Sequence, residues 1–260
     1  MSKARTLANL ISDNAELADG QISVAEVVGA APTASPTFTG GIDVTGTAVT
    51  DGLTVAGNVS VDGGTIKLDG NYPVASHNVA LGNDALSSGS LSGSNNVALG
   101  SNSLALNTSG AQNIGIGRNS LDANTTGGNN VGIGHSALTS NLTGGNNVAI
   151  GREALQSNTT AELSTAVGYQ SLYANTTANA ITAFGAYSLK TNTTGAANVA
   201  VGYSALELNT TGGSNTALGY KALEANTTAS NNTAVGYQAA YSNTTGQFNT
   251  STGRQSLRSN

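Results

Sequence analysis

The chain contains Asn198-Val-Ala-Val-Gly-Tyr-Ser-Ala-Leu-Glu-Leu-Asn-Thr-Thr-Gly-Gly-Ser214, followed at once by Asn215-Thr-Ala-Leu-Gly-Tyr-Lys-Ala-Leu-Glu-Ala-Asn-Thr-Thr-Ala-Ser-Asn231. This 17-residue unit extends in both directions, and we number its positions 1 to 17. Position 5 is glycine in all eleven copies: Gly82, Gly100, Gly117, Gly134, Gly151, Gly168, Gly185, Gly202, Gly219, Gly236 and Gly253. A short period repeated so often predicts a stack of similar coils rather than one globular core.

Each coil begins with an alternating pattern. Positions 2 and 4 are β-branched or apolar, whereas positions 1, 3 and 5 are mostly Asn, Ala and Gly. A period of two predicts a strand. We expect positions 2 and 4 to point into the coil, and the small residues at position 3 to form a flat outer face. The second apolar column is position 9, where we expect the core ladder of Leu121, Leu138, Leu155, Leu172, Leu189, Leu206 and Leu223.

The predicted fold is all-β, a parallel β-solenoid or β-roll of eleven coils. Two units make 34 residues, a length used by paired-helix repeats, but the Gly, Thr and Asn in every coil are poor helix formers. The Ala-Leu-x-x-Asn piece is either a second short strand or a helical turn. Because each coil has about two large apolar side chains, we expect an intertwined parallel homotrimer, with the Ala and Gly faces packed around its axis.

The segments before the repeats differ in character. Residues 1–28 form an N-terminal attachment segment, with Leu7, Leu10 and Leu17 spaced as in a short helical coiled coil and Ile11 beside them. Residues 29–41 are a linker rich in Pro and Gly. Residues 42–77 contain short apolar repeats ending in Gly, which predict a trimeric β shaft. The solenoid occupies residues 78–260.

Several motifs of the chain resemble those of known families. Ala34-Ser-Pro-Thr-Phe-Thr-Gly40, the Val-Thr-Gly and Val-Asp-Gly repeats and the Asn-Thr-Thr-Gly coils resemble tail fibres of tailed bacteriophages, notably marine and cyanobacterial phages. Asn147-Val-Ala-Ile-Gly151 resembles the head repeat of trimeric autotransporter adhesins, a left-handed parallel β-roll. Together the resemblances cover nearly the whole chain. They imply a trimeric fibre that docks on the phage tail by its N-terminal end and extends towards the host surface, where a distal fibre protein can follow.

Composition and motifs argue against most catalytic and cofactor-binding roles. The chain has no Cys and two His, His77 and His135, more than three coils apart, so we expect no metal or cofactor. Asp51, Asp62 and Asp69 each precede Gly and are better explained as turn residues than as calcium ligands. The carboxylates of the repeats occupy differing coil positions, which does not indicate a paired-acid glycosidase. We expect a non-enzymatic protein.

Charge and hydropathy give the remaining expectations. Residues 1–77 hold eight acids and three bases, and residues 78–260 hold six of each, so the net charge of −5 belongs to the first part. This distribution offers no nucleic-acid footprint. No apolar run is long enough to span a membrane, and we expect no secretory signal.

Two polar columns stand out in the coils. The Asn at position 12 fits a glycosylation sequon in nine coils, but a ladder of stacked amides explains the repetition better. Position 6 carries Tyr169, Tyr203, Tyr220 and Tyr237, interrupted by Ala186. These rings either bind a glycan receptor or stack on each other for stability.

These observations predict a structural phage tail fibre, located on the virion and outside the cell, whose partners are two sister chains, a tail or adaptor protein and a host receptor. A bacterial trimeric surface adhesin is the alternative. An ice-binding solenoid and a glycan depolymerase fit less well.

Overall fold

The computed structural model describes residues 70–72 and 75–259, which lie within the unit Gly64–Asn260. This part is an all-β parallel β-solenoid of about ten turns, and it contains no helix. Its strands are β1 (Gly70–Tyr72), β2 (Ala75–Leu81), β3 (Val97–Leu99), β4 (Ile114–Ile116), β5 (Val131–Ile133), β6 (Val148–Ile150), β7 (Thr165–Val167), β8 (Thr182–Phe184), β9 (Val199–Val201), β10 (Thr216–Leu218), β11 (Thr233–Val235) and β12 (Thr250–Thr252). No candidate membrane-spanning helix is found among the described residues.

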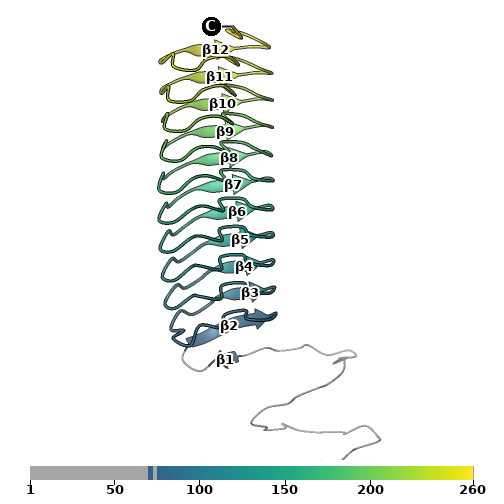
Figure 1. Ribbon diagram of the computed structural model, residues 1–260, viewed down its shortest axis with the longest axis vertical. Coiled ribbons are helices and arrows are strands. Elements are labelled where there is room, and N and C mark those ends of the chain that lie inside the picture. The colour runs from purple at the N-terminus through teal and green to yellow at the C-terminus, as the bar shows by residue number, and fades with distance from the viewer. Residues whose placement is uncertain (1–69, 73–74, 260) are drawn as a thin grey trace, which may run out of the picture. The chain divides into compact units, whose positions relative to one another are not determined.

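The strands form one sheet in chain order. β1 pairs with β2 in antiparallel fashion, and β2 to β12 are parallel, so each coil adds one strand to the stack (Figure 1). The register is strict: Ala200 of β9 lies opposite Ala217 of β10, which lies opposite Ala234 of β11. The predicted strand at the start of each coil is therefore confirmed, and it covers positions 2 to 4.

Hydrogen bonds between coils continue well beyond the strands. The amide of Gly202 donates to the carbonyl of Phe184 at 2.7 Å, and the amide of Leu206 donates to the carbonyl of Ala222 at 3.0 Å. Farther along the coil, the amide of Thr210 donates to the carbonyl of Thr227 at 2.8 Å. The main chain is thus satisfied by the neighbouring coils on both sides, as a buried backbone requires.

The Ala-Leu-x-x-Asn piece is neither a second strand nor a helix. In the coil of Gly202, the amide of Ala205 donates to the carbonyl of Gly202 at 3.3 Å, and the amide of Asn209 donates to that of Leu206 at 3.1 Å. Ser204 and Leu206 both have φ of 52°, a left-handed conformation in which single residues reverse the chain direction. The piece is a succession of tight turns.

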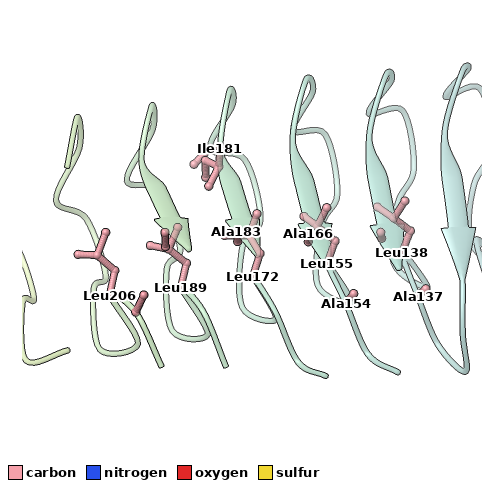
Figure 2. Close-up of a cluster of buried hydrophobic side chains, with 14 of the residues drawn as sticks. Ala137, Leu138, Ala154, Leu155, Ala166, Leu172, Ile181, Ala183, Leu189 and Leu206 are labelled. Carbon is pink, nitrogen blue, oxygen red and sulfur yellow. The ribbon is translucent and has the colours of Figure 1, made fainter. Parts of the chain in front are cut away.

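The core contains one leucine in nearly every coil, at position 9, where Ala240 is the exception. Leu121, Leu138, Leu155, Leu172, Leu189, Leu206 and Leu223 are all fully buried, and Figure 2 shows five of them in consecutive coils. Alanine at position 3, such as Ala166 and Ala183, packs from the strand side and is also fully buried.

The predicted direction of the strand side chains was wrong. Position 3 points inwards and positions 2 and 4 point outwards, as the exposed fractions of 54% for Phe184 and 47% for Leu218 demonstrate. The reason is the width of the coil. A Cβ built on Gly115, at position 3, would lie 3.4 Å from Cγ of Leu104 and 2.5 Å from Oγ of Ser103. Only a small side chain fits between the strand and the leucine.

The amide ladder expected at position 12 is confirmed. Nδ2 of Asn209 donates to Oδ1 of Asn192 at 2.7 Å and to the carbonyl of Gly212 at 2.9 Å, and Nδ2 of Asn226 donates to Oδ1 of Asn209 at 2.8 Å. A second ladder runs along position 1, where Oδ1 of Asn198 accepts from the main-chain N–H of Asn215 at 2.8 Å. These buried amides join successive coils on the inside of the solenoid.

Three sequence predictions fall wholly or largely on residues outside the described part. The helical segment with Leu7, Leu10, Ile11 and Leu17, and the linker at residues 29–41, lie entirely there. Of the predicted shaft at residues 42–77, only β1 and the first residues of β2 are described.

We predict that replacing Asn209 with Ala destabilises the solenoid by at least about 2 kcal/mol. The change leaves Oδ1 of Asn192 and one N–H of the Asn226 side chain without a partner, whereas the carbonyl of Gly212 still accepts from Nδ2 of Asn198. An unsatisfied buried polar group costs about 1–3 kcal/mol. Urea unfolding followed by circular dichroism measures the loss. Thr211→Ala removes an exposed side chain two residues away and should change little; equal losses in the two variants would contradict a stabilising amide ladder.

Position 5 requires glycine for two reasons: its φ is positive, and its Cα lies close to the backbone of the next coil. Substitutions at different coils can separate the two effects. Gly202 has φ of 134°, and a Cβ there would lie 2.5 Å from the carbonyl oxygen of Gly219 in the next coil. Gly253 has φ of 113°, but a Cβ built there has no atom of another coil within 4 Å.

We therefore predict that Gly202→Ala destabilises the protein by more than about 3 kcal/mol, since it adds a collision between coils to a backbone strain of about 1–3 kcal/mol. Gly253→Ala should show only the strain. Urea midpoints of the two variants at equal protein concentration measure the difference. If the two losses are the same, the contact between coils does not determine the glycine.

Candidate recognition surface

The tyrosines and nearly all charged side chains of the solenoid lie at three positions of the coil. From residue 78 onwards, all seven Tyr, all six Lys and Arg, and His135 occupy positions 6, 7 and 10. Five of the six acids also occupy positions 7 and 10, and Glu162 at position 16 is the exception. Hydrogen bonds, ion pairs and ring contacts join these three positions to one another. We call this surface the polar ridge.

The four tyrosines that the sequence analysis singled out at position 6 all lie on this ridge. Tyr203, Tyr220 and Tyr237 form a stack, with ring centres 5.4 and 5.2 Å apart and planes inclined by 12° and 6°. Each of the three rings remains more than two-fifths exposed. Tyr169 lies two coils before Tyr203 and is separated from it by the coil of Ala186.

Tyr187 closes this gap, which the sequence prediction missed. Its ring centre lies 5.3 Å from that of Tyr169 and 5.7 Å from that of Tyr203, in edge-to-face contacts. Burial among these neighbours raises the pKa of Tyr187 above its usual value. Because position 7 turns a side chain onto the same corner as position 6, a tyrosine there replaces the ring absent at Ala186. The five rings are one continuous column.

Cationic groups lie over the rings. Nζ of Lys190 lies 5.0 Å from the ring centre of Tyr187, and Cζ of Arg254 lies 5.7 Å from that of Tyr237. Cζ of Arg258 lies 5.9 Å from the ring centre of Tyr241. Contacts of this kind favour a cation above an aromatic face.

Two carboxylates of the ridge, those of Glu153 and Glu224, form local ion pairs. Oε1 of Glu224 accepts from Nζ of Lys221 at 2.9 Å, which raises the pKa of the Lys221 ammonium. Glu224 also raises the pKa of the Tyr241 phenol beside it.

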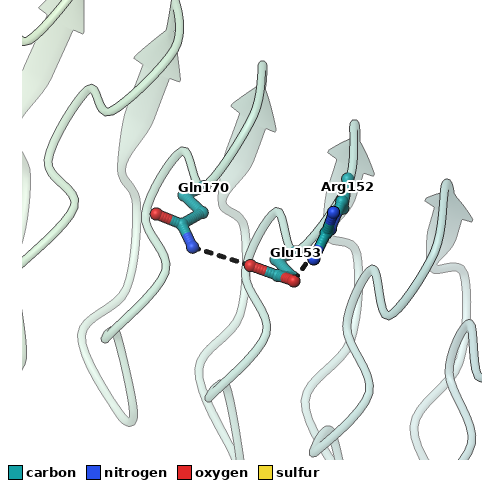
Figure 3. A network of polar contacts seen from close by, with 3 residues as sticks. All are labelled: Arg152, Glu153 and Gln170. Carbon is teal, nitrogen blue, oxygen red and sulfur yellow. Dashed lines mark hydrogen bonds and ion pairs between the residues drawn. The ribbon is translucent and has the colours of Figure 1, made fainter.

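Figure 3 shows a comparable group in an earlier part of the ridge. Nε2 of Gln170 donates to Oε2 of Glu153 at 2.7 Å, and Nε of Arg152 donates to Oε1 at 2.9 Å. These contacts hold the pKa of Glu153 below its usual value, and the hydrogen bond from Gln170 has the largest effect. The ridge is therefore a network of contacts between coils.

The other residues considered for catalysis or metal binding are dispersed. Asp122 lies at position 10, where burial raises its pKa. His77 is exposed in β2, and Asp51, Asp62 and Asp69 lie outside the described residues. Within the part of the chain that the structure describes, no three His, Cys, Asp or Glu side chains are placed to hold a metal ion.

A second surface is formed by the outward face of the strands. It contains positions 2 and 4, among them Ile114, Ile150, Phe184, Val199 and Leu218, whose exposed fractions range from 36% to 54%. Parallel sheets are normally covered on both faces, and exposed apolar patches of this kind mark interaction sites. We call this surface the strand face.

Comparisons with known proteins give no match: no protein-family model, no curated protein and no solved structure matches the chain.

Proposed function

We propose that the protein is a structural tail fibre of a tailed bacteriophage, a homotrimer that docks on the tail through its N-terminal region and extends towards the host surface. The observation that carries this proposal is the solenoid itself, in which coils in strict register make a rod with an uncovered apolar strand face. The resemblance of the Ala34 to Gly40 motif and of the coils to phage fibres points to the same function. The protein acts by binding and not by catalysis, and its location is the virion.

The strand face supports self-association. A second copy of the same rod has the same spacing of coils, so its positions 2 and 4 meet those of the first copy along the whole length. A partner with another spacing would lose register within a few coils. The small residues at position 3, expected at first around the trimer axis, are buried inside the coil, and the strand face takes their place in the proposed trimer.

A parallel trimer suits the dimensions of this face. Each strand from β3 to β12 has three residues, about 7 Å between its first and last Cα at 3.3 Å per residue, so the face is narrow and three copies can close around one axis. In a parallel arrangement each coil meets its own equivalent at the same height. The large Phe184 then meets Phe184, and the Thr252 of the more polar β12 meets Thr252.

We predict that the purified protein has three times its chain mass of 25.6 kDa by light scattering. Phe184→Asp with Val201→Asp places two charges on the strand face and should give monomers, because buried unpaired charges are strongly unfavourable. The matched control is Thr194→Asp with Thr211→Asp, which places two charges on exposed positions of the same two coils and should remain trimeric. A monomeric or dimeric wild type contradicts the trimer, and equal behaviour of the two variants contradicts the strand face as its interface.

The location is tested on virus particles. We predict that gold-labelled antibodies against residues 78–260 decorate fibres that project from the tails of purified phage, and that antibodies against residues 1–28 bind close to the tail. Decoration of bacterial cell surfaces in place of particles would favour the adhesin. Particles that carry no label would contradict the fibre assignment.

A further inference from the structure

The polar ridge changes character along the rod. Between residues 83 and 156 it carries three acids, Asp84, Asp122 and Glu153, and the two bases Arg118 and Arg152, with His135. Between residues 169 and 258 it carries four bases and two acids, and it contains all seven tyrosines of the solenoid. This second part, the aromatic–basic ridge, has an excess of two positive charges in a chain whose net charge is −5.

Three cations of the aromatic–basic ridge are available to a ligand. Among the described residues, the ion pairs are Arg152 with Glu153 and Lys221 with Glu224. Lys190, Arg254 and Arg258 form none there, and each lies over a tyrosine ring at 5.0 to 5.9 Å. Packing against a ring orients such a side chain without neutralising its charge. The cations therefore favour an anionic ligand.

Exposure alone does not explain this composition. Position 14 is also exposed, yet it is Thr in eight of the nine coils from residue 108 to residue 245, with Ser109 as the exception. Positions 6, 7 and 10 differ from coil to coil and still hold nearly every charged and aromatic side chain. A face that only needed to be solvated would not require tyrosines, since Thr and Asn serve elsewhere on the same rod.

The stacking of the rings selects between two kinds of polyanion. Single-stranded nucleic acid binds by stacking its bases on free aromatic faces, but the faces of Tyr203, Tyr220 and Tyr237 are packed against each other. What these rings offer to a ligand is their edges and phenol groups, one per coil. A phenol both donates and accepts hydrogen bonds, which suits the hydroxyl groups of sugars.

We propose that the aromatic–basic ridge, residues 169–258, binds an acidic polysaccharide laid along the rod axis. Lys190, Arg254 and Arg258 contact its carboxylate or sulfate groups, and the tyrosine column contacts its hydroxyl groups. The inference rests on the proposed function, because it identifies the class of host receptor that such a fibre would contact. Repetition of weak contacts in successive coils gives useful affinity to a chain ligand through multivalency.

The test measures binding of the full-length protein to immobilised polygalacturonate and dextran sulfate by biolayer interferometry, with neutral dextran and oligodeoxythymidine as comparisons. The wild type should bind both acidic polysaccharides, with an affinity that falls as salt is added, and should bind neutral dextran and oligodeoxythymidine at least about tenfold more weakly. A preference for oligodeoxythymidine, equal binding to neutral dextran, or no binding to either acidic polysaccharide overturns the proposal.

Variants locate the binding on the rod. Lys190→Gln, Arg254→Gln and Arg258→Gln combined should weaken binding at least about tenfold. The matched control is Arg118→Gln with Arg152→Gln, which removes cations from the earlier part of the ridge and should leave affinity within about twofold. Equal losses in the two variants would mean non-specific charge attraction and overturn the proposal.

The phenol groups are tested by combining Tyr203→Phe, Tyr220→Phe and Tyr237→Phe, which keeps the stacked rings. Affinity should fall several-fold while the circular dichroism melting curve stays unchanged; unchanged affinity overturns the role of the tyrosines in binding. Because these measurements use purified protein, they can fail while the antibodies still label phage tails, or succeed while the antibodies label none. The two proposals are therefore separable.

Discussion

The strict register between successive coils is the constraint on which the rest of the structure depends. Each residue contacts its own equivalents one coil before and one coil after, as the pairing of Ala200 with Ala217 and Ala234 illustrates. A residue type must therefore pack well against the equivalent residues of the coils before and after it. This explains why glycine at position 5 and asparagine at position 12 recur along the rod. The glycines of successive coils lie backbone to backbone, and each asparagine side chain bonds to the asparagine at the same position of the neighbouring coil and to a carbonyl of its own turn.

The same constraint makes the interior narrow. In most coils one leucine from position 9 and one small residue from position 3 fill the interior, which is little apolar burial for the entropy of ordering 17 residues. The hydrogen bonds that run around the whole coil satisfy the main chain, but the apolar side chains at positions 2 and 4 remain outside. Association through the strand face would cover them and add the burial that a single rod lacks.

The period of the sequence was sufficient to predict the solenoid, the strand at the start of each coil and the amide ladder. It was not sufficient to predict which strand face is inside, because alternation separates two faces without distinguishing them. That choice depends on the coil width, which is determined by contacts such as that of Gly115 with Leu104. Tyr187 was missed for a similar reason: alignment by position separates it from Tyr169, whereas the corner brings their rings together. The helical segment, the shaft and the trimer stay predictions.

The polar ridge can vary because the frame does not depend on its side chains. Tyr187, at position 7, is held by its main-chain amide, which donates to the carbonyl of Tyr169, and the same position carries Asp, Asn, Ser, Glu, Gln or Lys in other coils. By contrast, Thr193 at position 13 bonds to the next coil through its own hydroxyl. Charged and aromatic residues can therefore change on the ridge with little effect on stability. A rod of this kind separates its two tasks by coil position, since buried positions maintain the stack and ridge positions remain available for recognition.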